Sequence, residues 1–165
     1  MTEQGLTGKG LFDHGKIHML SQMSLEIASS NKKIAVNLVG TCTALLTFTI
    51  VFLYDRATTG KLDLLLFQLT LVSIILSIFM FTVSALFYDI SMNSFVSNDK
   101  TTARAKLLIG NGFFRFGLFI LLLEPTLITY SLYLTEVAAL SLLLWIILVL
   151  YAAFMWLRTR AAKVI

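Results

Sequence analysis

The sequence predicts an all-α membrane protein: an antiparallel bundle of four transmembrane helices, with an N-terminal amphipathic helix and both termini in the cytoplasm. Its 165 residues are 58% hydrophobic and only 13% charged, and the mean hydropathy is +0.86. Four apolar segments reach the roughly 20 residues that a helix needs to cross a bilayer. This composition excludes an ordinary soluble domain, and the chain has no room for a separate soluble catalytic domain.

The first element is a leader over residues 1–33, in which we expect an amphipathic helix from about Leu11 to Ser30. Its apolar residues recur at helical spacing; they are Ile17, Leu20, Met23 and Ile27. Such a helix can lie in the membrane interface, pack on the bundle or dock a cytoplasmic partner. His14 and His18 have the spacing of two metal ligands on one helix face, but the chain has no other histidine, so we predict no metal site.

The transmembrane domain is predicted over residues 34–157. Its spans are Ile34–Tyr54, Leu62–Ile90, Leu107–Tyr133 and Val137–Leu157. Only three residues separate the third span from the fourth, which predicts a tight hairpin. The longest connection, Ser91–Lys106, is polar, and its Asp99 is expected to cap a helix that leads into the third span. A basic tail, residues 158–165, follows the fourth span.

The distribution of basic residues predicts the orientation. Of the thirteen Lys and Arg residues, ten lie in the leader, the Ser91–Lys106 connection and the tail. Two, Arg56 and Lys61, lie on the opposite side, and Arg115 lies within a span. Because cytoplasmic segments carry the excess of basic residues, both termini are expected in the cytoplasm, with the chain in the cytoplasmic (inner) membrane. The net charge of +4 then reflects orientation, and no basic stripe predicts nucleic-acid binding.

Two charged residues, Arg115 and Glu124, interrupt the third span. A charge in hydrocarbon costs at least about 2.5–3.5 kcal/mol. Nine residues of helix place the two side chains on opposite faces and roughly 13 Å apart, so they do not pair with each other. Arg115 can snorkel to the cytoplasmic interface or reach Asp89. Glu124 has no basic partner at its depth, and Gln68 is the nearest expected hydrogen-bond partner.

Pro125 directly follows Glu124. Since proline lacks a backbone N–H, it should bend the helix and free the carbonyl of Leu121. A carboxyl group, a free carbonyl and a bend can together form a cation or proton site. They can equally belong to a protonated, hydrogen-bonded acid that stabilises the fold, and the sequence leaves both readings open.

Small and weakly polar residues form stripes on the first two spans. They are Gly40 and Ala44, with Asn37, Thr41 and Thr47, on the first, and Thr70, Ser73, Ser77 and Ser84 on the second. Such stripes are typical of close helix packing with interhelical hydrogen bonds, and a pore lining is the alternative. We interpret Gly110 and Gly112, at the start of the third span, as packing residues in the same sense.

The sequence has no nucleophile–base arrangement, glycine-rich phosphate loop or haem-ligating pair, so we expect no enzymatic activity and no cofactor. The leading hypothesis is a non-enzymatic integral membrane subunit that anchors, assembles or senses. It is expected to be homo-oligomeric or part of a larger membrane complex and to dock a cytoplasmic protein. The alternative is a homo-oligomeric ion channel or membrane-permeabilising effector, for example in a stress or phage-defence module.

Overall fold

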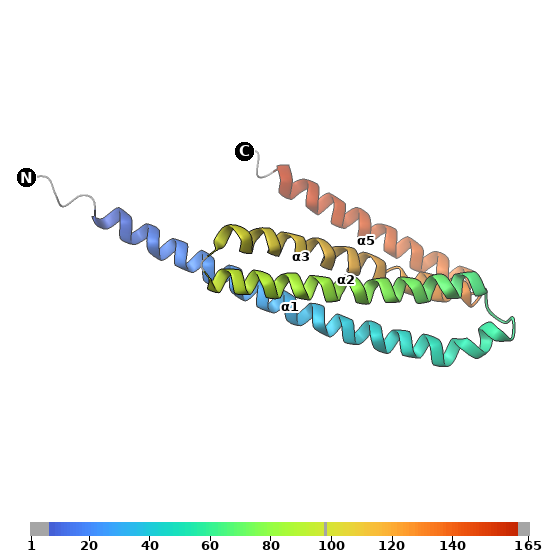
Figure 1. Cartoon of the computed structure of the whole chain (residues 1–165). Helices are drawn as coiled ribbons and strands as arrows, with labels where there is room; N and C mark the ends of the chain where they lie inside the picture. Colours follow the sequence, from blue (N-terminus) through green and yellow to red (C-terminus); the bar gives the residue numbers. More distant parts are fainter. Residues whose placement is uncertain (1–6, 98, 162–165) are drawn as a thin grey trace, which may run out of the picture. The chain divides into compact units, whose positions relative to one another are not determined.

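The described part of the chain is helical, as predicted. The computed structural model describes the backbone of residues 7–97 and 99–161, and the side chains of residues 22–97 and 99–154. The helices, shown in Figure 1, are α1 (Thr7–Thr58), α2 (Leu64–Val96), α3 (Lys100–Leu121), α4 (Glu124–Ser131) and α5 (Thr135–Ala161).

Four segments are long and apolar enough to cross a membrane, which indicates a multi-pass membrane protein. They are Gln22–Thr58, Leu64–Val96, Lys100–Ser131 and Thr135–Phe154. The third of them contains both α3 and α4, so the span that carries the two charges is interrupted.

α1 is one continuous helix, whereas the sequence predicted a separate amphipathic helix before the first span (Figure 1). No glycine or proline lies between Ser30 and Ile34 to end a helix there, and proline and glycine are the residues that disfavour helix most. At 1.5 Å per residue, its 52 residues extend about 78 Å, far more than the roughly 30 Å of a hydrocarbon core. The described part of the leader and the first span therefore belong to one helix.

Recognisable capping motifs end and begin these helices. Backbone bonds from Gly60 to Ala57 (3.4 Å) and from Lys61 to Arg56 (3.0 Å) form a Schellman motif after α1, with Gly60 at a φ of 72°. After α4 the same motif has Tyr133 in the left-handed position, at a φ of 59°. A tyrosine there is unusual, because a side chain normally disfavours positive φ.

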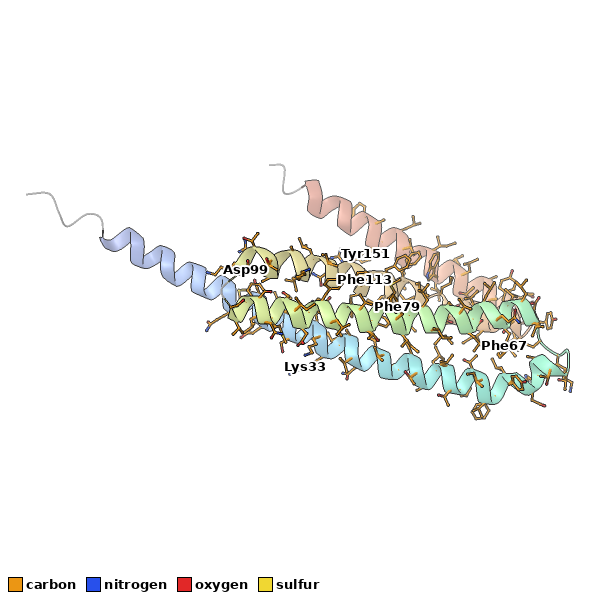
Figure 2. All side chains as sticks on the ribbon, in the orientation of Figure 1. Lys33, Phe67, Phe79, Asp99, Phe113 and Tyr151 are labelled. Carbon is orange, nitrogen blue, oxygen red and sulfur yellow. The ribbon has the colours of Figure 1, made fainter. Side chains whose placement is uncertain are left out.

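Aspartates cap the N-termini of α2 and α3. The Asp63 carboxylate accepts the N–H of Leu66 at 3.0 Å, and the Asp99 carboxylate accepts the N–H of Thr102 at 3.1 Å. Figure 2 shows Asp99 at the start of α3, which confirms the predicted cap. The hydrogen bonds from the Thr102 side chain and backbone lower the pKa of Asp99, because they stabilise its charged form.

The chain divides into two compact units, which are described separately. Unit 1 comprises residues 1–37 and 81–114, and unit 2 comprises residues 38–80 and 115–165.

In unit 1, α2 and α3 are joined by serine hydroxyls that donate to backbone carbonyls. Ser84 donates to Gly110 at 2.9 Å and Ser91 donates to Ala103 at 2.8 Å. Both bonds are buried, and they are seven residues apart on each helix. Because the two donors share one face of α2, and the two acceptors one face of α3, the helices follow each other in register over at least two turns.

A polar cluster ties α1 to these two helices within unit 1. The Tyr88 hydroxyl donates to the side-chain oxygen of Asn111 at 2.7 Å, and the Asn31 amide donates to the same oxygen at 3.3 Å. At the next residue of α1 and of α2, Lys32 forms an ion pair with Asp89 at 2.5 Å. Lys32 was interpreted from the sequence only as an orientation signal, so this contact was missed.

Unit 2 has a small apolar core where α1 ends and α2 begins. Leu53, Ala57, Leu62 and Phe67 are buried together, with Leu71, Ile128 and Leu132 packed against them. The N–H of Asp63 also donates to the carbonyl of Ser131 at 3.1 Å, which fixes the end of α4 beside the start of α2.

Candidate functional site

The candidate site lies in unit 2, where the third span is interrupted. α3 ends at Leu121 and α4 begins at Glu124. In the turn between them, the N–H of Leu123 donates to Ile120 at 2.9 Å, three residues back and not four. Pro125 follows and supplies no N–H to the carbonyl of Leu121. The sequence predicted a bend here, and the structure interrupts the regular helix at Leu122 and Leu123, although Leu123 keeps helical φ and ψ angles of −82° and −20°.

A tryptophan from α5 compensates part of this break. The tightened turn removes the usual helical donor, the N–H of Leu123, from the carbonyl of Phe119. The indole N–H of Trp145 donates to that carbonyl at 3.2 Å, and the Trp145 ring meets the Phe119 ring edge-on, with centroids 4.6 Å apart. Because an unsatisfied carbonyl is costly in hydrocarbon, this bond stabilises the interrupted backbone.

Glu124 is the first residue of α4, and its side chain is almost completely buried, with 1% of its surface exposed. Neither carboxylate oxygen has a hydrogen-bond partner in the described part of the chain. A buried carboxylate is costly unless a cation, a proton or several donors neutralise it. Its position in the first turn of α4 gives only partial compensation from the helix dipole.

Two polar groups interact with this carboxyl group: the Ser73 hydroxyl of α2 and the Cys42 thiol of α1. Ser73 directs its proton to the carbonyl of Thr70, at 3.0 Å, so the hydroxyl lone pairs remain available to the site. Gln68, the partner expected from the sequence, is exposed instead. That expectation was wrong because Gln68 lies on a different face of α2 from the buried residues Phe67 and Thr70.

A second buried polar group lies one turn from Ser73. The Ser77 hydroxyl is fully buried and has no hydrogen-bond partner among the described residues. The donors Ser91 and Ser84 are seven residues apart on α2, and their acceptors Ala103 and Gly110 are seven residues apart on α3. The next pair in this series would be the Ser77 hydroxyl and the Gly117 carbonyl, and these two groups are not hydrogen-bonded. On the α5 side, Thr126 donates to Ser141 at 3.1 Å. Unit 2 therefore contains several hydroxyl groups in an otherwise apolar interior.

Arg115 and Asp89 do not form the pair considered from the sequence. Asp89 pairs with Lys32, and Arg115 is exposed, with no ion pair among the described residues. Glu124 is buried at the start of α4, whereas Arg115 is exposed on α3.

The stripe predicted on α2 is largely buried, and the stripe predicted on α1 is not. Thr70, Ser77 and Ser84 are buried and Ser73 is half-buried, whereas Gly40 and Ala44 are exposed. A methyl group added at Gly40 would meet no atom within 4 Å. Four buried residues of α1 are spaced by seven, namely Ala28, Ala35, Cys42 and Thr49, and the buried Leu53 and Ala57 follow at steps of four.

The leader residues assigned to partner docking are only partly described. Met23 is 57% exposed and Ile27 is 48% exposed. The side chains of Ile17 and Leu20 lie outside the described residues.

No group of three or more His, Cys, Asp or Glu residues that could hold a metal ion is present among the described residues. Comparison with protein families, with curated proteins and with solved structures finds no match.

Proposed function

We propose that the protein is a non-enzymatic integral membrane subunit that works in an assembly of several chains. In this proposal its four spans form an antiparallel bundle in the cytoplasmic membrane, with both termini in the cytoplasm. The excess of basic residues in the leader, the α2–α3 connection and the tail supports this orientation.

The main support for assembly with other chains is that Arg115, a charged residue within a span, is exposed. Charged residues within spans almost always face a bundle interior, a water-filled cavity or an opposite charge. Arg115 has none of these among the described residues. α5 is also poorly covered by the rest of the chain, since only 6% of its most apolar 18-residue stretch is buried. A neighbouring subunit that covers these surfaces would neutralise Arg115 and bury apolar area that a single chain leaves open.

The oligomeric mass of the protein in lipid nanodiscs tests this proposal. We expect the wild-type chain to be larger than a monomer, alone or with other membrane subunits, and Arg115→Leu to shift it towards the monomer. Arg104→Leu is the matched control, because Arg104 is an exposed arginine near the start of α3. A wild-type monomer without any bound subunit would contradict the proposal.

In the same proposal the leader docks a cytoplasmic protein. The exposed apolar side chains of Met23 and Ile27 support this role. Met23→Gln combined with Ile27→Gln should release the partner without loss of membrane insertion, whereas Glu26→Gln, at an exposed neighbour, should retain it. Equal retention by both variants would exclude this surface.

A second candidate function is a homo-oligomeric ion channel or membrane-permeabilising effector. The buried, unpartnered carboxyl group of Glu124 beside a broken helix favours it, because broken helices line ion sites in membrane transporters. Glu124→Gln should change the ion conductance of the reconstituted protein and leave its oligomer intact. Wild-type protein without conductance would exclude this candidate.

A further inference from the structure

We propose that Glu124, together with Ser73, forms a binding site for one monovalent cation, a proton or an alkali metal ion. The inference goes beyond the assembly function, since a subunit can bind a cation without conducting it. It is argued from residues of unit 2 alone.

The first argument is that neither carboxyl oxygen of Glu124 accepts a hydrogen bond of good geometry from the described residues, although the Ser73 hydroxyl lies near the group. The Glu124 side chain is 1% exposed. A group that only stabilised the fold would be expected to have its hydrogen bonds satisfied, because more than nine in ten buried polar groups are satisfied. An exchangeable ligand accounts for two vacant acceptors on one side chain.

The second argument concerns the groups that face the carboxyl group. α1 contributes the Cys42 thiol, which is the titratable group that interacts with it, and α2 contributes the Ser73 hydroxyl. Neither is basic, so neither neutralises a carboxylate. Arg115, the charged residue of α3 in unit 2, is exposed. No described residue of unit 2 therefore supplies a counter-charge to this carboxyl group.

The third argument sets the class of ligand. One carboxylate carries one charge, and the described residues contain no cluster of acidic, histidine or cysteine ligands. Divalent cations with oxygen ligands usually require more carboxylates or several retained waters. The neighbouring oxygen is the Ser73 hydroxyl. The Leu121 carbonyl, three residues before Glu124 in the chain, lacks its helical donor because Pro125 has no N–H. Neutral oxygens and one carboxylate suit a proton or an alkali metal ion.

The Ser73 hydroxyl can interact with either a proton on Glu124 or an alkali metal ion while its bond to Thr70 is kept. Its proton is directed to the Thr70 carbonyl at 3.0 Å, so its lone pairs can accept a hydrogen bond from protonated Glu124 or coordinate a metal ion. When the site is empty, rotation of the hydroxyl would direct the same proton to the carboxylate.

Labelling with a hydrophobic carbodiimide tests the site on the full chain in lipid nanodiscs. The reagent adds to a protonated carboxyl group and leaves a stable N-acylurea, which mass spectrometry maps to a residue. We expect labelling of Glu124, and little labelling of the exposed Glu136. Labelling should fall as the pH rises, because the reagent requires the protonated acid.

Added sodium or potassium chloride, with choline chloride at equal ionic strength as the control, distinguishes the two ligands. Suppression of labelling by sodium or potassium identifies an alkali metal site, and labelling that depends on pH alone identifies a proton site. Glu124 that is unlabelled at every pH, or labelled independently of pH and cation, would overturn the proposal. Each of these outcomes can occur whether or not the protein oligomerises.

Ser73→Ala supplies a second test that does not remove the carboxyl group. For an alkali metal site, the cation concentration that halves labelling should rise roughly tenfold, because a polar ligand to a charge is lost. For a proton site, the pH dependence of labelling should shift. Thr43→Val is the matched control, since Thr43 is exposed and bonds only to its own helix, at the Val39 carbonyl. Equal behaviour of the two variants would remove Ser73 from the site.

Discussion

Gly110 lies where α3 approaches α2 closely within unit 1, and replacing it tests that approach. A Cβ at Gly110 would lie 3.1 Å from two ring carbons of Tyr88 and 3.3 Å from the Cβ of Phe87. Tyr88 is fully buried, and its hydroxyl is bonded to Asn111 at 2.7 Å, so its ring has little room to move. We therefore expect Gly110→Ala to lower the free energy of unfolding relative to a matched alanine elsewhere on α3.

Gly112→Ala is that matched variant. A Cβ at Gly112 would meet no atom within 4 Å, so this substitution should only gain the helix propensity of alanine over glycine, about 0.8–1.0 kcal/mol. Gly110→Ala gains the same helix propensity, but overpacking against Tyr88 should lower its free energy of unfolding by about 1–3 kcal/mol. The difference between the two variants removes the propensity term and isolates the steric cost.

Reversible unfolding by titration with sodium dodecyl sulfate in mixed micelles measures this difference. We expect Gly110→Ala to be less stable than Gly112→Ala by about 1–3 kcal/mol. Equal stability of the two variants would refute the close approach of α3 to Tyr88, and with it the interpretation of Gly110 as a packing residue.

Three further predictions use the same titration or thermal unfolding. Ser84→Ala should lower the free energy of unfolding by about 0.6 kcal/mol, the average for an interhelical hydrogen bond in a membrane. Ser77→Ala should leave that free energy unchanged or raise it, because it removes a buried hydroxyl that has no hydrogen-bond partner among the described residues. Equal losses in the two variants would contradict this assignment. Tyr133→Gly should raise the free energy of unfolding by about 1 kcal/mol, because glycine adopts a positive φ without steric strain. Gly60→Ala should lower the free energy of unfolding by a similar amount for the same reason. No change in either variant would refute the backbone strain at positive φ. Asp99→Ala should lower the thermal midpoint at neutral pH, and the loss should disappear in acid. The folded-state pKa of Asp99 lies below its ordinary value of 3.8, so the carboxylate stabilises the fold at neutral pH and loses that effect as the pH falls through the lowered pKa; a loss that persists in strong acid would contradict the cap.

The elements of this fold could be predicted from hydropathy, and its contacts could not. Length and apolar composition predict the spans, and a lone aspartate before two threonines predicts the cap of α3. The continuity of α1 was missed because the change from polar to apolar residues at Lys33 indicates a membrane boundary and not a helix end. The pairing of Asp89 with Lys32 was missed because the partners are 57 residues apart, and hydropathy carries no information on such separations.

In a membrane protein, hydropathy also does not show which face of each helix is buried against other helices. Lipid and protein interior are equally apolar, so residue size and hydroxyl content mark the packed face. On α2 the buried positions alternate in steps of three and four; they are Phe67, Thr70, Ile74, Ser77, Phe81, Ser84, Tyr88, Ser91 and Phe95. Bulky side chains alternate along this series with small hydroxyl residues. This seven-residue period is the pattern of helices that pack along their length, and it places Thr70, Ser77 and Ser84 on the buried face but Ser73 beside it.

The same seven-residue period marks the buried positions of α3 and, counted on along the chain, reaches Glu124 at the start of α4. The buried residues Ala103, Gly110 and Gly117 are spaced by seven, and the next member of the series is Glu124. Seven residues turn a helix by nearly two full turns, so Ala103, Gly110 and Gly117 lie on one side of α3. Arg115, two residues before Gly117, lies about 200° around α3 from it and is exposed. The sequence therefore places a carboxyl group where the series otherwise has residues with little or no side chain. Pro125 follows at once, and the helix breaks there. A break at this position lets the chain bury a group larger than alanine or glycine in a face built for close approach. This is why we regard Glu124 as a site and Arg115 as a surface residue that another subunit or the membrane interface must satisfy.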